Sequence, residues 1–143
     1  MPDLVAPLFH KTYMSVGDIA EACENRNIAY TARQLYQFIA DWNSRPENRE
    51  EMLKGLPSAS NTIFQQAAIA TVLHALCDRD NMPLPVWARD VKNPTEITLD
   101  GIEISENDFG SLVKAEAPTV CTEHNVYFEA SEMDKGTDRL VTI

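Results

Sequence analysis

The stretch NTIFQQAAIATVLHALCDR, residues 61–79, decides the fold. When it is drawn as a helix, apolar side chains cover most of its circumference, and no proline interrupts it. Such a helix must be covered on nearly every side, so the stretch predicts a central, buried helix with other helices around it. Its alanines leave room for close approach, and Ser58, Ser60 or Asn61 is expected to cap its N-terminus.

Three shorter helices are predicted before the central one. Ser15 begins a capping-box pattern and predicts a helix over residues 16–25. Thr31 begins the same pattern for a second helix, which ends near residue 44 and carries apolar side chains at helical spacing. A proline in the first turn and a glycine after the last turn indicate a short third helix over residues 46–54.

The pattern changes after the central helix. MPLPVW at residues 82–87 cannot continue a helix, because its two prolines lack the amide donor. Asp-Gly at residues 100–101, flanked by apolar residues, predicts a small β-hairpin over residues 97–104, with an irregular loop as the alternative. A last helix is predicted over residues 105–115, and residues 126–128 form either a short strand or part of a helix.

These elements predict a mainly α fold: a compact helical bundle around a central buried helix, with a small β-hairpin or extended C-terminal part. The chain has 143 residues and is 44% hydrophobic, which is enough for one domain with its own core. We expect an N-terminal arm at residues 1–14, a single helical domain at 15–134 with an acidic subregion at 96–134, and a tail at 135–143.

The cysteines and the N-terminus indicate the cellular compartment in which the protein is expected. Cys23, Cys77 and Cys121 cannot all pair with one another, and their neighbours are apolar or mixed, so we expect reduced, partly buried thiols. The N-terminus lacks the pattern of a signal peptide, and no apolar run reaches the ~20 residues of a membrane span. We therefore expect a cytoplasmic protein that does not associate with membranes.

Negative charge is concentrated in the acidic subregion. The formal net charge of the chain is −10, and between residues 96 and 134 ten acidic side chains accompany one basic side chain, Lys114. Such a stretch repels phosphate groups, so we expect no direct binding of nucleic acid. If this stretch is a working surface, its partner is a basic protein. The alternative is a solvated face that only aids solubility.

The chain lacks the usual signatures of an enzyme. Its five glycines are isolated, which excludes a Walker loop, a dinucleotide fingerprint and a nucleophile elbow. The acidic residues could pair as catalytic carboxylates, but no set of nucleophile, base and orienting group is recognisable. We predict no enzyme activity and no cofactor.

Two pairs of residues could in principle bind zinc. His74 and Cys77 share one face of the central helix, and Cys121 and His124 repeat the spacing of three. The distance between the two pairs matches no zinc-finger pattern. Buried thiols and a histidine at the edge of the core explain the same residues, so we predict no metal.

A helix-break-helix rhythm over residues 16–42 suggests a DNA-binding regulator, with Arg33, Gln34 and Gln37 on the second helix. The break is longer than a tight turn, and no basic stripe is available to hold phosphates. Two amphipathic helices packed on the central helix explain the same pattern.

Several short segments resemble a known group of proteins. The segments, in order, are LYQFIADW at 35–42, GLP at 55–57, MPLPVW at 82–87, KAEAP at 114–118 and EHNVYF at 123–128. This order resembles a group of small actinobacterial proteins that are encoded beside a nucleotidyltransferase-like partner and are regarded as antitoxins. The resemblance covers roughly residues 33–134, and Pro-x-Pro-x-Trp is its most specific element.

The chain departs from that group at two places in or near the acidic subregion. Thr122, Glu123 and His124 stand where the group usually has an arginine pair, and residues 93–96 replace a tryptophan-rich linker. Both departures indicate that the acidic subregion is specialised in this chain.

The charge pattern and the resemblance together predict a non-enzymatic, antitoxin-like inhibitor. It would neutralise a basic partner that handles nucleotides or nucleic acid, either a toxin or a nuclease. The candidate partner-binding residues are Asp100, Glu103, Glu106, Asp108, Phe109, Glu116, Glu123, Tyr127, Phe128 and Glu129. The carboxylates would pair with lysines and arginines, and the aromatic side chains, where exposed, would act as apolar anchors. Core packing is the alternative role for each aromatic residue.

An inhibitor that mimics nucleic acid, such as a phage inhibitor of a defence nuclease, is the main alternative function. It predicts carboxylates spaced like phosphates along one exposed ridge. The antitoxin-like function predicts a mixed patch with an apolar centre.

Overall fold

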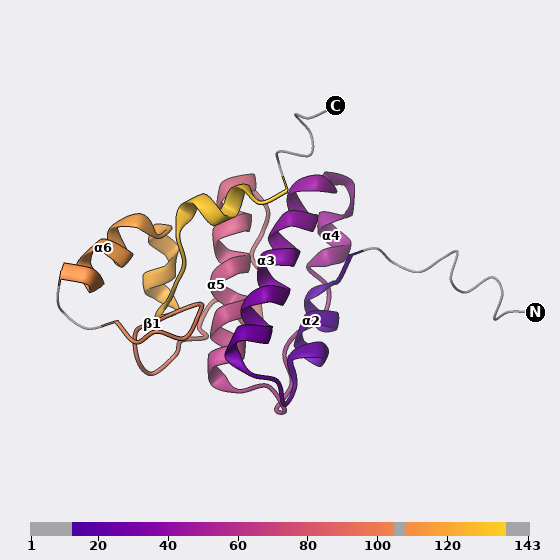
Figure 1. Ribbon diagram of the computed structural model, residues 1–143. Helices are drawn as coiled ribbons and strands as arrows, with labels where there is room; N and C mark the ends of the chain where they lie inside the picture. Colours follow the sequence, from indigo (N-terminus) through magenta and orange to yellow (C-terminus); the bar gives the residue numbers. More distant parts are fainter. Residues whose placement is uncertain (1–12, 105–107, 137–143) are drawn as a thin grey trace, which may run out of the picture.

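Helix α5 (Ile63–Asp80) lies at the centre of the fold, as predicted (Figure 1). It packs against α2 (Val16–Cys23), α3 (Ile28–Ser44) and three elements of the C-terminal part. Its buried residues occupy most of its circumference: Gln65, Ala67, Ala68, Ile69, Ala70, Thr71, Val72, Leu73, Ala75, Leu76 and Cys77. A helix covered on so many sides positions the rest of the chain around it.

The computed structural model describes residues 13–104 and 108–136. Most of the predicted N-terminal arm, Glu106 and the end of the predicted tail lie outside these ranges. Within them, no helix combines the length and the apolar character needed to cross a bilayer.

The N-terminus of α5 is capped by Thr62, one residue beyond the predicted candidates. Thr62 Oγ1 accepts from the backbone N–H of Gln65 at 3.1 Å, and the Gln65 side chain accepts from the Thr62 N–H at 3.1 Å. Asn61 has a different role, because its Nδ2 donates to the Ala20 carbonyl at 2.8 Å. This bond ties the start of α5 to α2.

Helices α2 and α3 both pack on α5, as expected if the helix-break-helix pattern reflects core packing. Helix α2 begins with the predicted capping box. Helix α3 begins earlier than predicted, because Asn27 Oδ1 accepts from the Tyr30 N–H at 2.9 Å. Thr31, the predicted cap, lies inside the helix and is buried.

The predicted third helix is a short turn, η2 (Pro46–Asn48), followed by α4 (Arg49–Met52). The chain then turns at Gly55, whose φ of +92° lies in the left-handed region. Here two backbones meet: the Gly17 N–H donates to the Lys54 carbonyl at 3.0 Å. A Cβ atom on Gly55 would lie 2.6 Å from the Gly17 Cα atom. The contact between α2 and this turn therefore requires glycine at position 55.

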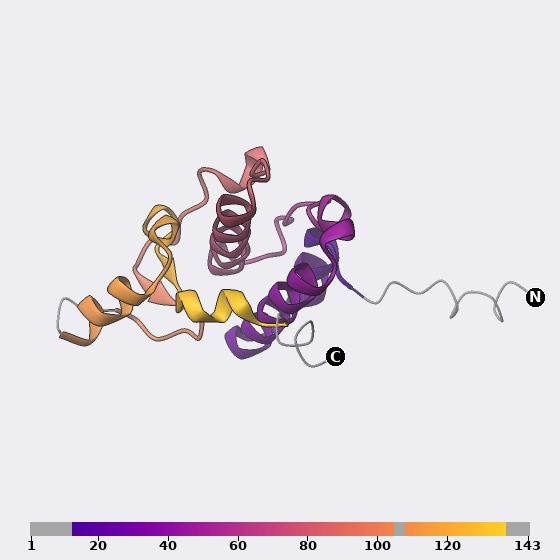
Figure 2. The ribbon, with the colours of Figure 1, turned by 90° about the horizontal axis from the view of Figure 1, so that it is seen from above.

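The C-terminal part combines short helices with a small sheet (Figures 1 and 2). Its elements are η3 (Val86–Ala88), β1 (Ile97–Thr98), α6 (Asp108–Glu116), η4 (Thr119–Glu123), β2 (Val126–Tyr127) and η5 (Ala130–Asp134). Strands β1 and β2 are parallel, with Ile97 opposite Val126. Segment η5 contacts α3, so the end of the described chain returns to the N-terminal helices.

The predicted hairpin is present as a short chain reversal next to β1. The Thr98 N–H donates to the Ile102 carbonyl at 2.8 Å, and Ile97 forms an antiparallel bridge with Glu103. The turn holds three residues rather than two, and it ends at Gly101, whose φ is +92°. Three-residue hairpin turns commonly end in a left-handed residue, and glycine adopts that conformation without steric cost.

All three cysteines are free and buried, one in α2, one in α5 and one in η4. Burial raises the pKa of Cys23 and Cys121, and it raises the pKa of Cys77 to about 11. The thiols are therefore protonated at neutral pH and react slowly as nucleophiles.

Candidate functional site

A pocket of about 260 Å³ lies between the hairpin, α6, β2, η5 and one side chain of α3. Its lining residues are Tyr36, Thr98, Asp100, Ile102, Phe109, Val113, Glu116, Tyr127, Phe128, Glu129 and Glu132. Apolar and aromatic groups thus alternate with carboxylates that come from separate segments of the chain.

The pocket brings together six of the ten candidate residues. These are Asp100, Phe109, Glu116, Tyr127, Phe128 and Glu129. Glu103 and Glu123 are exposed and do not line the pocket. Glu106 and the side chain of Asp108 lie outside the described part of the chain. Five lining residues were not among the candidates: Tyr36, Thr98, Ile102, Val113 and Glu132.

Three carboxylates at the pocket, Asp100, Glu116 and Glu129, form no ion pair with any cation of residues 13–104 and 108–136. Glu132 differs, because Lys135 Nζ lies 2.7 Å from its Oε2. The pocket therefore carries uncompensated negative charge from the hairpin, from α6 and from the segment that leads into η5.

Two tyrosine hydroxyls donate to carboxylates at or beside the pocket. Tyr36 donates to Asp100 Oδ2 at 3.3 Å, and Tyr127 donates to Glu96 Oε2 at 2.8 Å. Burial, followed by these carboxylates, raises the pKa of both phenols. Both tyrosines therefore stay neutral, and the negative charge of the site resides on carboxylates alone.

The aromatic candidates have two different positions. Phe109 on α6 is 49% exposed and lies near Ile102, which is 54% exposed and lines the same pocket. Tyr127 and Phe128 are only 2% and 5% exposed, so the expectation that they could serve as exposed anchors is wrong. Strand β2 pairs with β1 and also packs on α5 and η4. These neighbours explain why consecutive side chains in and after β2 are buried.

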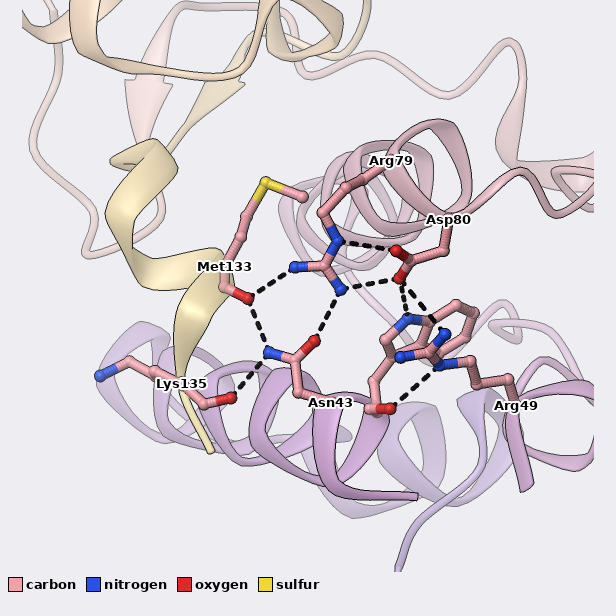
Figure 3. A network of polar contacts seen from close by, with 7 residues as sticks. Asn43, Arg49, Arg79, Asp80, Met133 and Lys135 are labelled. Carbon is pink, nitrogen blue, oxygen red and sulfur yellow. Dashed lines mark hydrogen bonds and ion pairs between the residues drawn. The ribbon is translucent and has the colours of Figure 1, made fainter. Parts of the chain in front are cut away.

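A polar network fixes the η5 wall of the pocket to α3 and α5 (Figure 3). Asn43 Nδ2 donates to the Met133 carbonyl at 2.6 Å and to the Lys135 carbonyl at 2.7 Å. Arg79 donates from Nη1 to the same Met133 carbonyl at 2.9 Å and from Nη2 to Asn43 Oδ1 at 2.6 Å. The amide of Asn43 therefore bonds on both its nitrogen and its oxygen side.

Asp80 extends this network to the core tryptophan. Its Oδ2 accepts from Trp42 Nε1 at 2.7 Å and from Arg79 Nη2 at 2.7 Å, and Arg49 Nη1 lies 3.7 Å away. Chiefly the Arg79 hydrogen bond lowers the pKa of Asp80, so the carboxylate is ionised at neutral pH. The network satisfies the indole N–H of a fully buried side chain, as a buried donor requires.

A second polar feature joins α5 to the C-terminal part through two histidines. His124 is fully buried, and its Nδ1 lies 2.7 Å from the Val91 carbonyl oxygen. Because a carbonyl only accepts, this nitrogen carries the proton, and in the neutral ring Nε2 accepts from His74 Nδ1 at 2.9 Å. Glu123 Oε2 lies 3.8 Å from the other nitrogen of His74.

The histidine pair joins one residue from each of the two pairs that were considered, and rejected, as zinc ligands. Within the described ranges, no three side chains of the His, Cys, Asp or Glu type are arranged to hold a metal ion. The hydrogen bonds to Val91 and between the two rings give both histidines a structural role.

The buried imidazole predicts a loss of stability in mild acid. Burial lowers the pKa of His124, the charge of His74 and Lys92 lowers it further, and the Val91 carbonyl and Glu123 oppose this. The unfolded chain therefore binds a proton near pH 6.5 that the folded chain resists, so stability is present above that pH and is lost as the pH falls. We expect the free energy of unfolding to fall between pH 8 and pH 5 by at most ~1.4 kcal/mol per pH unit for this proton.

Urea unfolding of the native chain and of a His124→Gln variant at several pH values measures this loss. The variant is expected to be less stable overall but to show a shallower dependence on pH in this range. An identical slope in both proteins would show that His124 is not responsible.

Comparison with protein families, with curated proteins and with solved structures found no match to this chain. The antitoxin-like resemblance accordingly stays a prediction, and the function is proposed from the site.

Proposed function

We propose that the chain is a non-enzymatic inhibitor, antitoxin-like in its action, that binds a basic protein through the acidic surface around the pocket. The observation that supports this proposal is the position of Asp100, Glu116 and Glu129. They lack ion-pair partners among the described residues and border one pocket with exposed apolar side chains. Charge complementarity points to a cationic partner.

The surface offers both parts of a protein interface. Phe109 and Ile102 provide apolar area that is available for burial, and the carboxylates surround them. In protein interfaces a few buried anchors supply most of the affinity, whereas long-range charge mainly sets the rate of encounter. An inhibitor of this kind would cover lysines or arginines with which the partner holds nucleotides or nucleic acid.

The arrangement fits this function better than mimicry of nucleic acid. A mimic requires carboxylates in an exposed row, spaced like phosphates. Here the carboxylates surround a hollow that also contains aromatic and aliphatic side chains, and Glu103 and Glu123 lie outside it. This mixed patch with an apolar centre is the pattern expected of the antitoxin-like inhibitor.

Charge reversal at the pocket tests the proposal. A Glu116→Lys, Glu129→Lys double variant is expected to slow association with the basic partner by about tenfold or more at low salt, because it replaces attraction with repulsion. The partner is first captured from a host lysate on the immobilised native chain and then purified. Its association rate and its activity on nucleotides or nucleic acid are measured with each variant.

The matched control is Glu47→Lys with Glu50→Lys. These residues belong to η2 and α4, which lie at the opposite end of the molecule from α6 (Figures 1 and 2). The control carries the same net charge as the test variant and should associate much faster than it. Equal slowing of the two variants would contradict docking at the pocket. Failure to recover any basic protein at low salt, or a captured partner that remains fully active, would contradict the inhibitor function itself.

A further inference from the structure

We infer that the pocket receives one arginine side chain of the partner. The inference rests on the proposed function and adds to it the chemical group that enters the site. The size of the pocket, its aromatic walls and the distribution of its carboxylates each support this assignment.

The volume of the pocket suits a single side chain. Pockets for cofactors and drug-sized ligands commonly measure ~300–1,000 Å³, whereas this one measures about 260 Å³. Apolar groups of Ile102, Phe109 and Val113 line it and can pack against an aliphatic stem. Long charged side chains bury such stems readily while their charged ends reach polar groups.

The aromatic rings of the site already attract cations. Lys135 Nζ lies 5.0 Å from the ring centroid of Tyr36, and Lys114 Nζ lies 6.0 Å from that of Tyr127. Both rings line the pocket. Each lysine is held by its own carboxylate, Lys135 by Glu132 and Lys114 by Glu96. The cations among the described residues therefore form no ion pair with the other three pocket carboxylates, of which Asp100 accepts from Tyr36 and Glu129 from Ser131.

Those three carboxylates lie on different segments and favour a guanidinium over an ammonium. Asp100 belongs to the hairpin turn, Glu116 ends α6, and Glu129 follows β2. A guanidinium presents five N–H donors in one plane and also stacks on aromatic rings. It can therefore bond to carboxylates on more than one side of the pocket, whereas an ammonium is a compact point charge.

A titration with short peptides tests this inference without the partner. The ¹⁵N-labelled full chain is titrated with the blocked tripeptide acetyl-Gly-Arg-Gly-amide, and amide chemical shifts are followed by NMR. We expect saturable shifts at Thr98, Val113 and Glu129. Blocked peptides with lysine or with neutral citrulline in place of arginine are expected to bind at least about tenfold more weakly, because they lack the planar fork or the charge.

Two double variants of equal charge localise the binding. Glu116→Gln with Glu129→Gln is expected to weaken binding of the arginine peptide at least about tenfold, whereas Glu47→Gln with Glu50→Gln should leave it nearly unchanged. Similar affinity for the citrulline or lysine peptide, equal weakening in both variants, or shifts that do not saturate would overturn the inference.

The failure of this inference and the failure of the proposed function are distinguishable. A basic partner that the native chain captures and inhibits, combined with no arginine binding in the pocket, would reject the inference alone. Specific arginine binding without any basic partner would reject the inhibitor function and leave the pocket's preference for arginine in place.

Discussion

An Asn43→Ala variant is expected to unfold with a free energy about 3 kcal/mol below that of the native chain. The change removes the bonds of Asn43 to the Met133 and Lys135 carbonyls and to the Arg79 guanidinium (Figure 3). Each such bond contributes about 1 kcal/mol net, and more where one partner is charged. Urea denaturation, with the midpoint and slope compared between the proteins, measures the loss.

The same variant should loosen the η5 wall of the pocket before the rest of the fold. Hydrogen exchange at the amides of residues 132–135 is expected to accelerate more than exchange in α5, since Asn43 bonds α3 to two carbonyls of this segment. Asn48→Ala is the matched control, because Asn48 makes no side-chain capping bond, and we expect a change within ~0.5 kcal/mol. A comparable loss of stability in both variants would show that the network does not hold the wall.

Gly55→Ala is the second substitution with a large expected effect, a loss of about 3 kcal/mol or more. A non-glycine residue in the left-handed region costs ~1–2 kcal/mol, and added atoms in a tightly packed place cost a further ~1–3 kcal/mol. Both penalties apply at Gly55, whose φ is +92° and whose Cβ would lie 2.6 Å from Gly17 Cα and 2.7 Å from Gly17 N. Thermal or urea unfolding measures the effect.

The other glycine of the same contact supplies the control. A Cβ atom on Gly17 would have its nearest neighbour, Gly55 Cα, at 3.4 Å, and Gly17 lies in the first turn of α2. Alanine favours a helix by up to ~1 kcal/mol over glycine, so Gly17→Ala should change the stability by less than about 1 kcal/mol in either direction. If both variants lost the same free energy of unfolding, the contact would not depend more strongly on glycine at position 55 than at position 17.

Much of the helical fold could be predicted because its signals are local. The central helix follows from its continuous apolar character, and the capping box of α2 lies within four consecutive residues. The start of α3 shows the limit of such signals. Asn27 and Thr31 are both good caps, and the chain uses Asn27 while burying Thr31.

Long-range pairings could not be predicted from the sequence. The parallel pairing of Ile97 with Val126 and the bonds from Asn43 to Met133 and Lys135 join residues far apart in the chain. No local pattern encodes such partners, because the polar groups of each short segment would bond to water if the segment were isolated. Tyr36 was not predicted as a pocket residue for the same reason, because it lies on α3 and the rest of the pocket lining comes from residues 98–132.

The candidate site was partly predictable from charge alone. The acidic subregion contains Asp100, Glu116 and Glu129, which the fold brings to one pocket. Charge density could not show that Glu123 would lie beside His74 instead. The roles of Tyr127 and Phe128 depend on what covers each side of β2, and only the packing of α5 and η4 determines that.

The three buried thiols also allow local unfolding of the chain to be measured without introducing a label site. Cys23, Cys77 and Cys121 lie in α2, α5 and η4, and a thiol-specific dye reaches each one only when its surroundings open. Labelling rates at the three sites therefore separate detachment of the C-terminal part from global unfolding. A dye that marks Cys121 well before Cys77 would place the pocket on the part of the chain that opens first.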